Sequence, residues 1–114
     1  MKVEKFEDLI CWQKSKKLTF LIYTLFKSNR DFSFCDQIKR ATVSIMNNIA
    51  EGFERQTNKE FSHFLYIAKG SCAEVRSMCC VALELGYILQ ADFEKINKLS
   101  SDTAKLISGL IKVL

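Results

Sequence analysis

Apolar side chains recur three and four positions apart along most of the chain, which is the spacing of α-helices with a buried face. Polar joints of a few residues separate four such segments. The expected helices run from about Glu7 to Lys27, from Ser33 to Arg55, from Thr57 to Leu89 and from Asp92 to Val113. Joints this short cannot cross the length of a helix, so the pattern predicts an all-α, antiparallel up-down four-helix bundle.

Capping signals define two of the predicted helix starts. Ser33 and Asp36 have the spacing of a capping box, and Thr57 and Glu60 have the same spacing in a clearer setting. The third segment is the longest and would span roughly 50 Å at about 1.5 Å per residue, with Gly86 in its last turn. Its neighbours are shorter, so we expect something else to cover the excess length.

The segments differ in how many apolar faces they carry. The fourth has a single stripe, formed by Phe93, Ile96, Ser100, Thr103, Ile107, Leu110 and Leu114. The third has one stripe for the bundle and a second one, formed by Ile67, Ser71, Met78, Val81, Leu85 and Ile88. The first likewise has a second apolar face, formed by Leu9, Trp12, Phe20 and Tyr23. A small bundle needs one buried face per helix, so these extra faces favour a homo-oligomer.

The predicted oligomer interface takes its members from these second faces: Ile67, Met78, Val81, Leu85, Ile88, Trp12 and Tyr23. The alternative for the two aromatic residues is that they only cap the edge of the bundle.

A continuous polar stripe runs along the second segment, formed by Gln37, Arg40, Ser44, Asn48, Glu51 and Arg55. A solvated face is one interpretation. The small residues Ala41, Ala50 and Gly52 beside the stripe favour another, in which a neighbouring helix approaches closely and Ser44, Asn48 and Glu51 form a buried hydrogen-bond network. Both interpretations stay open at this point.

Composition agrees with one soluble helical domain over residues 1–114. Hydrophobic residues make up 48% and charged residues 26%, which is the balance of an ordinary globular protein, and the absence of proline leaves long helices uninterrupted. The N-terminus lacks the apolar core of a signal peptide, and no run reaches the roughly 18 apolar residues of a membrane-spanning helix. We expect a cytoplasmic protein with no membrane partner.

The residues that commonly carry catalysis or bind metals are few. The five cysteines include no C-x-x-C pair, so free buried thiols are expected instead of a disulfide framework or a zinc site. His63 is the only histidine, and Glu60 one turn earlier is better placed as a capping residue than as a metal ligand. Hydrolase, phosphate-loop and zinc-protease motifs are missing, so we expect no enzyme, no cofactor and no metal.

Several strings in the second and third segments are characteristic in combination. They are Gln37-Ile38-Lys39-Arg40-Ala41, Asn48-Ile49-Ala50-Glu51-Gly52, Phe64-Leu65 and Ala68-Lys69-Gly70-Ser71, preceded by Phe6-Glu7-Asp8-Leu9 and Trp12-Gln13-Lys14. With these strings the chain resembles, over about residues 6–90, the bacterial four-helix bundle protein family, also called the 23S rRNA intervening sequence proteins. It departs from the family pattern at Met46, where a proline is usual, and in lacking a Phe-Pro joint between the first two helices.

The resemblance implies an up-down bundle assembled into a ring-like homopentamer, and it implies no settled activity. Some members of the family are encoded within insertions in large-subunit ribosomal RNA genes. A related group, the accessory variability determinant proteins of diversity-generating retroelements, binds nucleic acid and a reverse transcriptase.

Two functions are therefore considered. A formal charge of +4 favours non-specific binding of RNA or DNA, which a ring would strengthen by multivalency. The candidate contacts are Lys14, Lys17, Arg40, Arg55, Lys95, Lys98 and Lys105. No base-reading helix or aromatic stacking platform is evident in the sequence, so phosphate contacts are expected. The alternative is an oligomeric scaffold that docks another protein, with the same lysines acting only as a solvated face.

Overall fold

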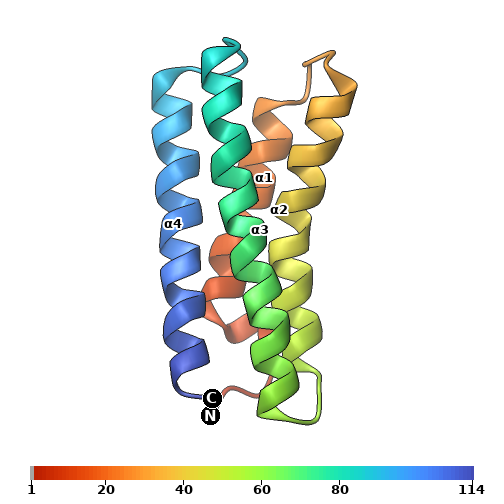
Figure 1. Cartoon of the computed structure of the whole chain (residues 1–114), viewed down its shortest axis with the longest axis vertical. Coiled ribbons are helices and arrows are strands. Elements are labelled where there is room, and N and C mark those ends of the chain that lie inside the picture. The colour runs from red at the N-terminus through yellow and green to blue at the C-terminus, as the bar shows by residue number, and fades with distance from the viewer. Residues whose placement is uncertain (1) are drawn as a thin grey trace.

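The computed structural model describes residues 2–114, which form four α-helices and one short 3-10 turn and include no strand. The elements are η1 (Phe6–Asp8), α1 (Ile10–Leu25), α2 (Phe32–Phe53), α3 (Asn58–Glu84) and α4 (Gln90–Lys112). The helices lie side by side in a body of 43 × 22 × 19 Å, and the joints between successive helices alternate between its two ends (Figure 1). The all-α prediction is confirmed.

The first predicted helix is divided at Leu9. This residue has an extended backbone (φ −72°, ψ 128°) that separates η1 from α1, so Glu7 and Asp8 lie in the 3-10 turn and not in the first α-helical turn. The side-chain amide of Gln13 donates from Nε2 to the Glu7 carbonyl at 3.0 Å and connects the two parts. The break allows the buried Leu9 side chain to join the core.

The second helix starts one residue earlier than predicted and has a different cap. Asp31 is its N-cap, and the Asp31 carboxylate accepts a hydrogen bond of 3.1 Å from the Phe34 amide. Ser33 therefore lies inside the first turn, so the predicted capping box at Ser33 and Asp36 is wrong. Asp31 also accepts a hydrogen bond of 2.6 Å from the Tyr87 hydroxyl, which comes from the joint between α3 and α4.

The third helix begins as predicted and ends five residues earlier. Thr57 is the N-cap, and its hydroxyl accepts from the Glu60 amide at 3.2 Å. At the other end, Gly86 adopts a positive φ of 74°, and the Tyr87 amide donates to the Ala82 carbonyl at 2.9 Å. This is the Schellman arrangement that terminates helices at glycine, so α3 is shorter than predicted, at 27 residues, and exceeds α2 and α4 by only a few residues.

The fourth helix begins at Gln90, two residues before the predicted start. Asp92 lies in its first turn, and the Asp92 carboxylate accepts a hydrogen bond of 3.2 Å from the backbone amide of Leu89, the N-cap residue.

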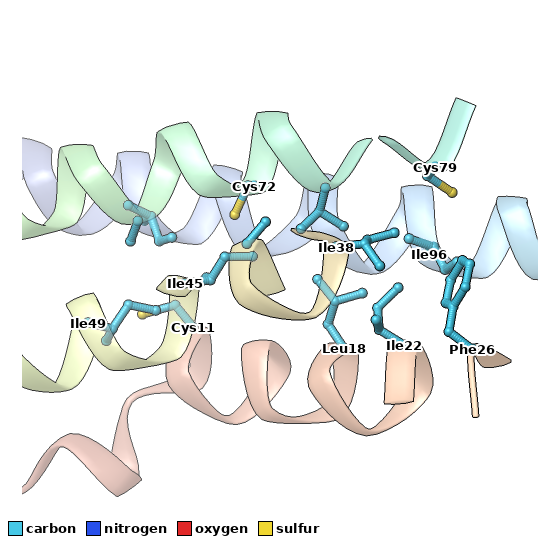
Figure 2. Packing of buried hydrophobic residues seen from close by; sticks show 14 of the residues in the cluster. Cys11, Leu18, Ile22, Phe26, Ile38, Ile45, Ile49, Cys72, Cys79 and Ile96 are labelled. Atoms are coloured by element: carbon cyan, nitrogen blue, oxygen red, sulfur yellow. The ribbon is translucent and has the colours of Figure 1, made fainter. Parts of the chain in front are cut away.

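The core lies along the axis of the bundle and takes side chains from all four helices (Figure 2). Ile96, Ser100, Thr103 and Ile107 of α4 are all buried, as the single stripe of this segment predicted. The Ser100 hydroxyl donates to the Cys72 carbonyl of α3 at 3.0 Å, so this buried polar group is satisfied across a helix pair. A slip of α4 along α3 would break that bond.

Gly52 marks the closest approach of α2 to α3. A Cβ atom built at this position would lie 2.6 Å from the Cβ of Phe64 and 3.0 Å from a ring carbon of Phe61. Real Cβ atoms do not tolerate the shorter distance. The close helix approach that the small residues of this segment predicted is therefore confirmed at Gly52.

Candidate nucleic-acid interface

Three of the predicted basic residues meet in a groove between α1 and α4. Lys14 comes from the second turn of α1, and Lys95 and Lys98 come from the second and third turns of α4. They line an open depression of about 320 Å³ together with Leu21, Leu99 and Asp102. Residues more than eighty positions apart in the sequence thus share one surface, with an apolar floor and a basic rim.

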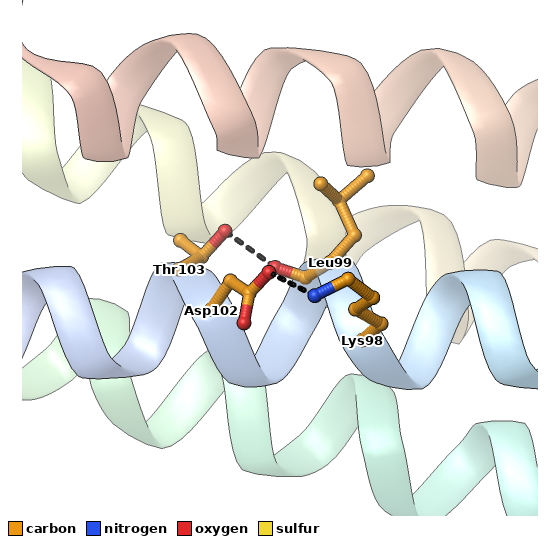
Figure 3. Close-up of polar contacts among 4 residues, drawn as sticks. All are labelled: Lys98, Leu99, Asp102 and Thr103. Carbon is orange, nitrogen blue, oxygen red and sulfur yellow. Dashed lines mark hydrogen bonds and ion pairs between the residues drawn. The ribbon is translucent and has the colours of Figure 1, made fainter.

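The charges in this depression are mostly unpaired. Lys98 Nζ lies 3.1 Å from Asp102 Oδ2, one turn further along α4, while Leu99 is directed toward α1 (Figure 3). The Lys98 side chain is 80% exposed, so this ion pair adds at most about 1 kcal/mol and can be exchanged for a phosphate. Among the ion pairs of residues 2–114, none includes Lys14 or Lys95. The depression therefore carries three ammonium groups against one carboxylate.

The same helix pair forms a second depression nearer the start of α1. It measures about 410 Å³ and is lined by Leu9, Ile10, Cys11, Lys105, Leu106, Gly109 and Leu110. Lys105 lies on its rim in the same way that Lys98 lies on the rim of the first depression. Together the two depressions make a groove along α1 and α4, called the basic groove below, whose four lysines are Lys14, Lys95, Lys98 and Lys105.

The remaining candidate cations lie elsewhere. Lys17 lines a separate depression on the outward face of α1, with Trp12 and Phe20 among its neighbours. Arg40 lies on α2 and pairs with Asp36 at 2.9 Å, while Arg55 lies in the joint just after α2 and pairs with Glu51 of that helix at 3.1 Å. The seven residues proposed from the sequence therefore do not make one surface.

The polar stripe of α2 contains a small hydrogen-bond network at its contact with α3. The Asn48 amide donates to the Ser44 carbonyl at 2.8 Å and to the Ser44 hydroxyl at 3.0 Å, and the Ser71 hydroxyl of α3 donates to the same hydroxyl at 3.0 Å. Glu51 does not join this network, because it is exposed and pairs with Arg55. Ser71 was missed because its spacing places it within the second apolar stripe of α3.

The apolar interface candidates divide into exposed and covered residues. Ile67 and Val81 on α3 and Leu85 at its C-cap are exposed, at 42%, 45% and 54%, and so is Tyr23 on α1 at 45%. Met78 is half-buried against the core, and Trp12 is half-buried with its ring packed edge-on against Phe6. Ile88 is buried, because α3 ends before it and the turn at Gly86 redirects it into the core; its place in the predicted interface is therefore wrong.

The cysteines are free, and four of the five are buried. Burial raises the pKa of Cys11 and Cys72 to about 11 and that of Cys79 to about 12, so these thiols stay protonated near neutral pH. Within residues 2–114 no group of three or more metal-ligating side chains is brought together. No helix in the same range is both long and apolar enough to cross a membrane.

The sequence over residues 7–109 matches the family model described as 23S rRNA-intervening sequence protein. The chain belongs to this family. The 23S rRNA-intervening sequence proteins are thus the family that the strings in the second and third segments indicated. A search of curated proteins gave no match.

Among solved structures, this 23S rRNA-intervening sequence protein is similar to a protein with unknown function from the S23 ribosomal protein family of Bacteroides thetaiotaomicron VPI-5482. The two chains are 27% identical, and their structures superpose with a TM-score of 0.84. The match covers 90% of this chain and 99% of the other. The similarity therefore extends over nearly the whole bundle, including the helices that form the basic groove.

Proposed function

We propose that this protein is a non-enzymatic, oligomeric binding protein that holds RNA or DNA by its phosphates in the basic groove. One observation carries the proposal: Lys14, Lys95 and Lys98 come together from distant parts of the sequence around a single carboxylate, that of Asp102. Phosphate contacts to lysine need no base-specific partner, so the binding should show little sequence preference.

Oligomerisation is the second part of this proposal. The exposed Ile67 and Val81 of α3, with Leu85 at its C-cap, form an apolar face, called the α3 face below, that a second copy of the chain can cover. A ring-like homopentamer of antiparallel up-down bundles would present the basic groove five times and add avidity to weak single contacts. The α3 face does not contain the residues that line the basic groove, so both can be occupied at once.

The proposed binding is tested by titrating a labelled oligonucleotide at two salt concentrations. Four lysines on four phosphates predict a roughly 50- to 150-fold loss of affinity per protomer when the salt concentration rises fourfold. Reversing Lys95, Lys98 and Lys105 to glutamate should abolish most of the binding at unchanged oligomer size. The matched control reverses Arg30, Lys59 and Lys69, which are exposed elsewhere and give the same change in net charge. Equal losses in the two variants would contradict a local groove.

The oligomer is tested by sedimentation of the wild type and of a variant with both Val81→Glu and Leu85→Glu. We expect the wild type to sediment as one discrete oligomer and the variant to dissociate while it keeps its helix content. A wild type that stays monodisperse at 13.1 kDa at micromolar concentration would refute the assembly.

The alternative function, docking of another protein, is favoured by one observation. The floor of the basic groove is apolar, with Leu21 and Leu99 in one depression and Ile10 and Leu106 in the other. An amphipathic helix with acidic flanks would fit such a groove. A binding titration that is flat with salt, or no binding of nucleic acid, would favour this scaffold.

A further inference from the structure

The outer edge of α1 carries two large aromatic rings that the bundle does not use. Phe20 is 65% exposed and Tyr23 is 45% exposed, and they lie three positions apart, on one side of the helix. Neither packs against the hydrophobic core. Within residues 2–114, Phe20 also takes part in none of the ring-ring or cation-ring contacts, so no other ring and no cation is stacked on it.

Lysines alternate with these rings. Lys16 Nζ lies 5.6 Å from the centre of the Trp12 ring, one turn before Phe20. Lys39 reaches across from α2, and its Nζ lies 5.1 Å from the centre of the Tyr23 ring. Lys17 lines a depression of about 460 Å³ with Glu7, Trp12, Gln13, Lys16 and Phe20. We call this surface the aromatic edge: Trp12, Lys16, Lys17, Phe20, Tyr23 and Lys39.

The charge of the aromatic edge identifies the kind of partner. Three ammonium groups, on Lys16, Lys17 and Lys39, lie beside the rings, and Glu7 is the only carboxylate that lines the depression. A partner that fits must offer flat apolar faces and negative charges at short, regular intervals. Unpaired nucleotides meet both needs, because each base has a face that can stack on a ring and each link carries a phosphate.

The aromatic edge also adjoins the basic groove. Lys14 of the groove and Lys17 of the edge are neighbours one turn apart on α1. A strand whose phosphates lie in the groove can therefore continue around α1 toward Phe20. In a duplex the faces of the bases are covered by their neighbours in the stack, so a duplex could use the groove but not the rings.

We propose that the aromatic edge is a base-stacking platform that makes this protein a binder of single-stranded nucleic acid, with Phe20 as the central stacking ring. Tyr23 offers a second ring, and Lys16, Lys17 and Lys39 contact the phosphates between the stacked bases. The proposal rests on the proposed function and deepens it by naming the single-stranded class. It also adds the stacking platform that was not evident in the sequence, because the apolar spacing of α1 assigned these rings to a second apolar face.

The test compares a labelled oligo(dT) strand with a labelled duplex of the same length, using the wild type, Phe20→Ala and Phe20→Trp. Phe20→Ala removes the ring on which one base stacks, so its affinity for oligo(dT) should be at least about fivefold lower than that of the wild type. Its salt dependence should stay unchanged, because no phosphate contact is lost. Duplex affinity should not change, and Phe20→Trp should keep or strengthen the binding of oligo(dT). The emission of Trp12, the only tryptophan, should be quenched when oligo(dT) binds, because it lies within the edge.

Phe32→Ala serves as the matched control, because Phe32 is 74% exposed at the start of α2 and lies outside the aromatic edge. Equal oligo(dT) affinity in the wild type and Phe20→Ala would overturn the stacking platform while leaving the salt-dependent groove intact. A lack of binding by either nucleic acid would overturn both proposals. A fall in oligomer mass in Phe20→Ala would show that the edge is a contact between copies. Phe20-dependent binding to vesicles of phosphatidylglycerol and phosphatidylcholine, without oligo(dT) binding, would assign it to a lipid surface.

Discussion

The contact at Gly52 allows a prediction whose sign depends on the structure. A Gly→Ala change inside a helix normally stabilises a protein by about 0.5–1 kcal/mol, because alanine loses less backbone entropy on folding. At Gly52 the added methyl group would lie 2.6 Å from the Cβ of Phe64, an atom fixed to the backbone of α3 that cannot rotate away. The helices must then separate, and overpacking of this kind costs about 1–3 kcal/mol. We expect a net loss of about 1–2 kcal/mol for Gly52→Ala.

Urea unfolding at one fixed protein concentration measures this loss, since the stability of an oligomer depends on concentration. Gly109→Ala is the matched control: it is also helical, and an added Cβ atom would meet nothing within 4 Å. It should leave stability unchanged or raise it. The reasoning would be refuted if Gly52→Ala were as stable as Gly109→Ala, because the helix pair would then tolerate the methyl group without moving.

Three further predictions concern polar and titratable groups. Asn48→Ala should cost about 0.5–1.5 kcal/mol in urea unfolding, because it removes one of the two hydrogen bonds that the Ser44 hydroxyl accepts, whereas the exposed Glu51→Ala should change little; equal effects would contradict the network described. Tyr87→Phe removes the hydroxyl that lowers the pKa of Asp31 below its ordinary 3.8. In the wild type, this hydrogen bond to the charged Asp31 stabilises the fold at neutral pH, and the stabilisation is lost as the pH falls below 3.8 and the carboxylate is protonated. The difference in unfolding free energy between this variant and the wild type should therefore shrink from pH 7 to pH 3, and a difference that stays constant would contradict this role of the Tyr87 hydroxyl. With a thiol reagent, Cys80 should react rapidly and the four buried thiols only on unfolding, and a Cys80→Ser variant that keeps the rapid phase would disprove this.

Local sequence signals predicted the number of helices, one N-cap and the buried stripe of α4. They failed where a distant residue decides the local structure. Ser33 has a good capping pattern, but Asp31 caps α2 instead, and its carboxylate is held by Tyr87 from 56 positions further along the chain. Spacing also placed Ile88 on the outside of a longer α3. The positive φ at Gly86 ends the helix first, and helical spacing no longer applies beyond it.

The candidate site was less predictable than the fold. The sequence identified the lysines individually, but the meeting of Lys14 with Lys95 and Lys98 depends on which helices are neighbours across the bundle. Arg40 and Arg55 looked equivalent to these lysines in the sequence, yet each forms an ion pair with a carboxylate one helical turn away. For Phe20, apolar spacing indicated a covered face, and only the exposure of the ring and the lysines around it distinguish a binding surface.

The bond between Tyr87 and Asp31 joins the two interhelical joints that lie at one end of the bundle (Figure 1). Phe34 strengthens the connection, because its ring contacts both Phe26 from the end of α1 and Tyr87. The two joints are therefore not independent hinges. Fraying of either one breaks contacts made by the other, so the backbone amides around both should exchange their hydrogens with solvent as a single cooperative unit. An insertion in one joint would then loosen a segment more than fifty residues away.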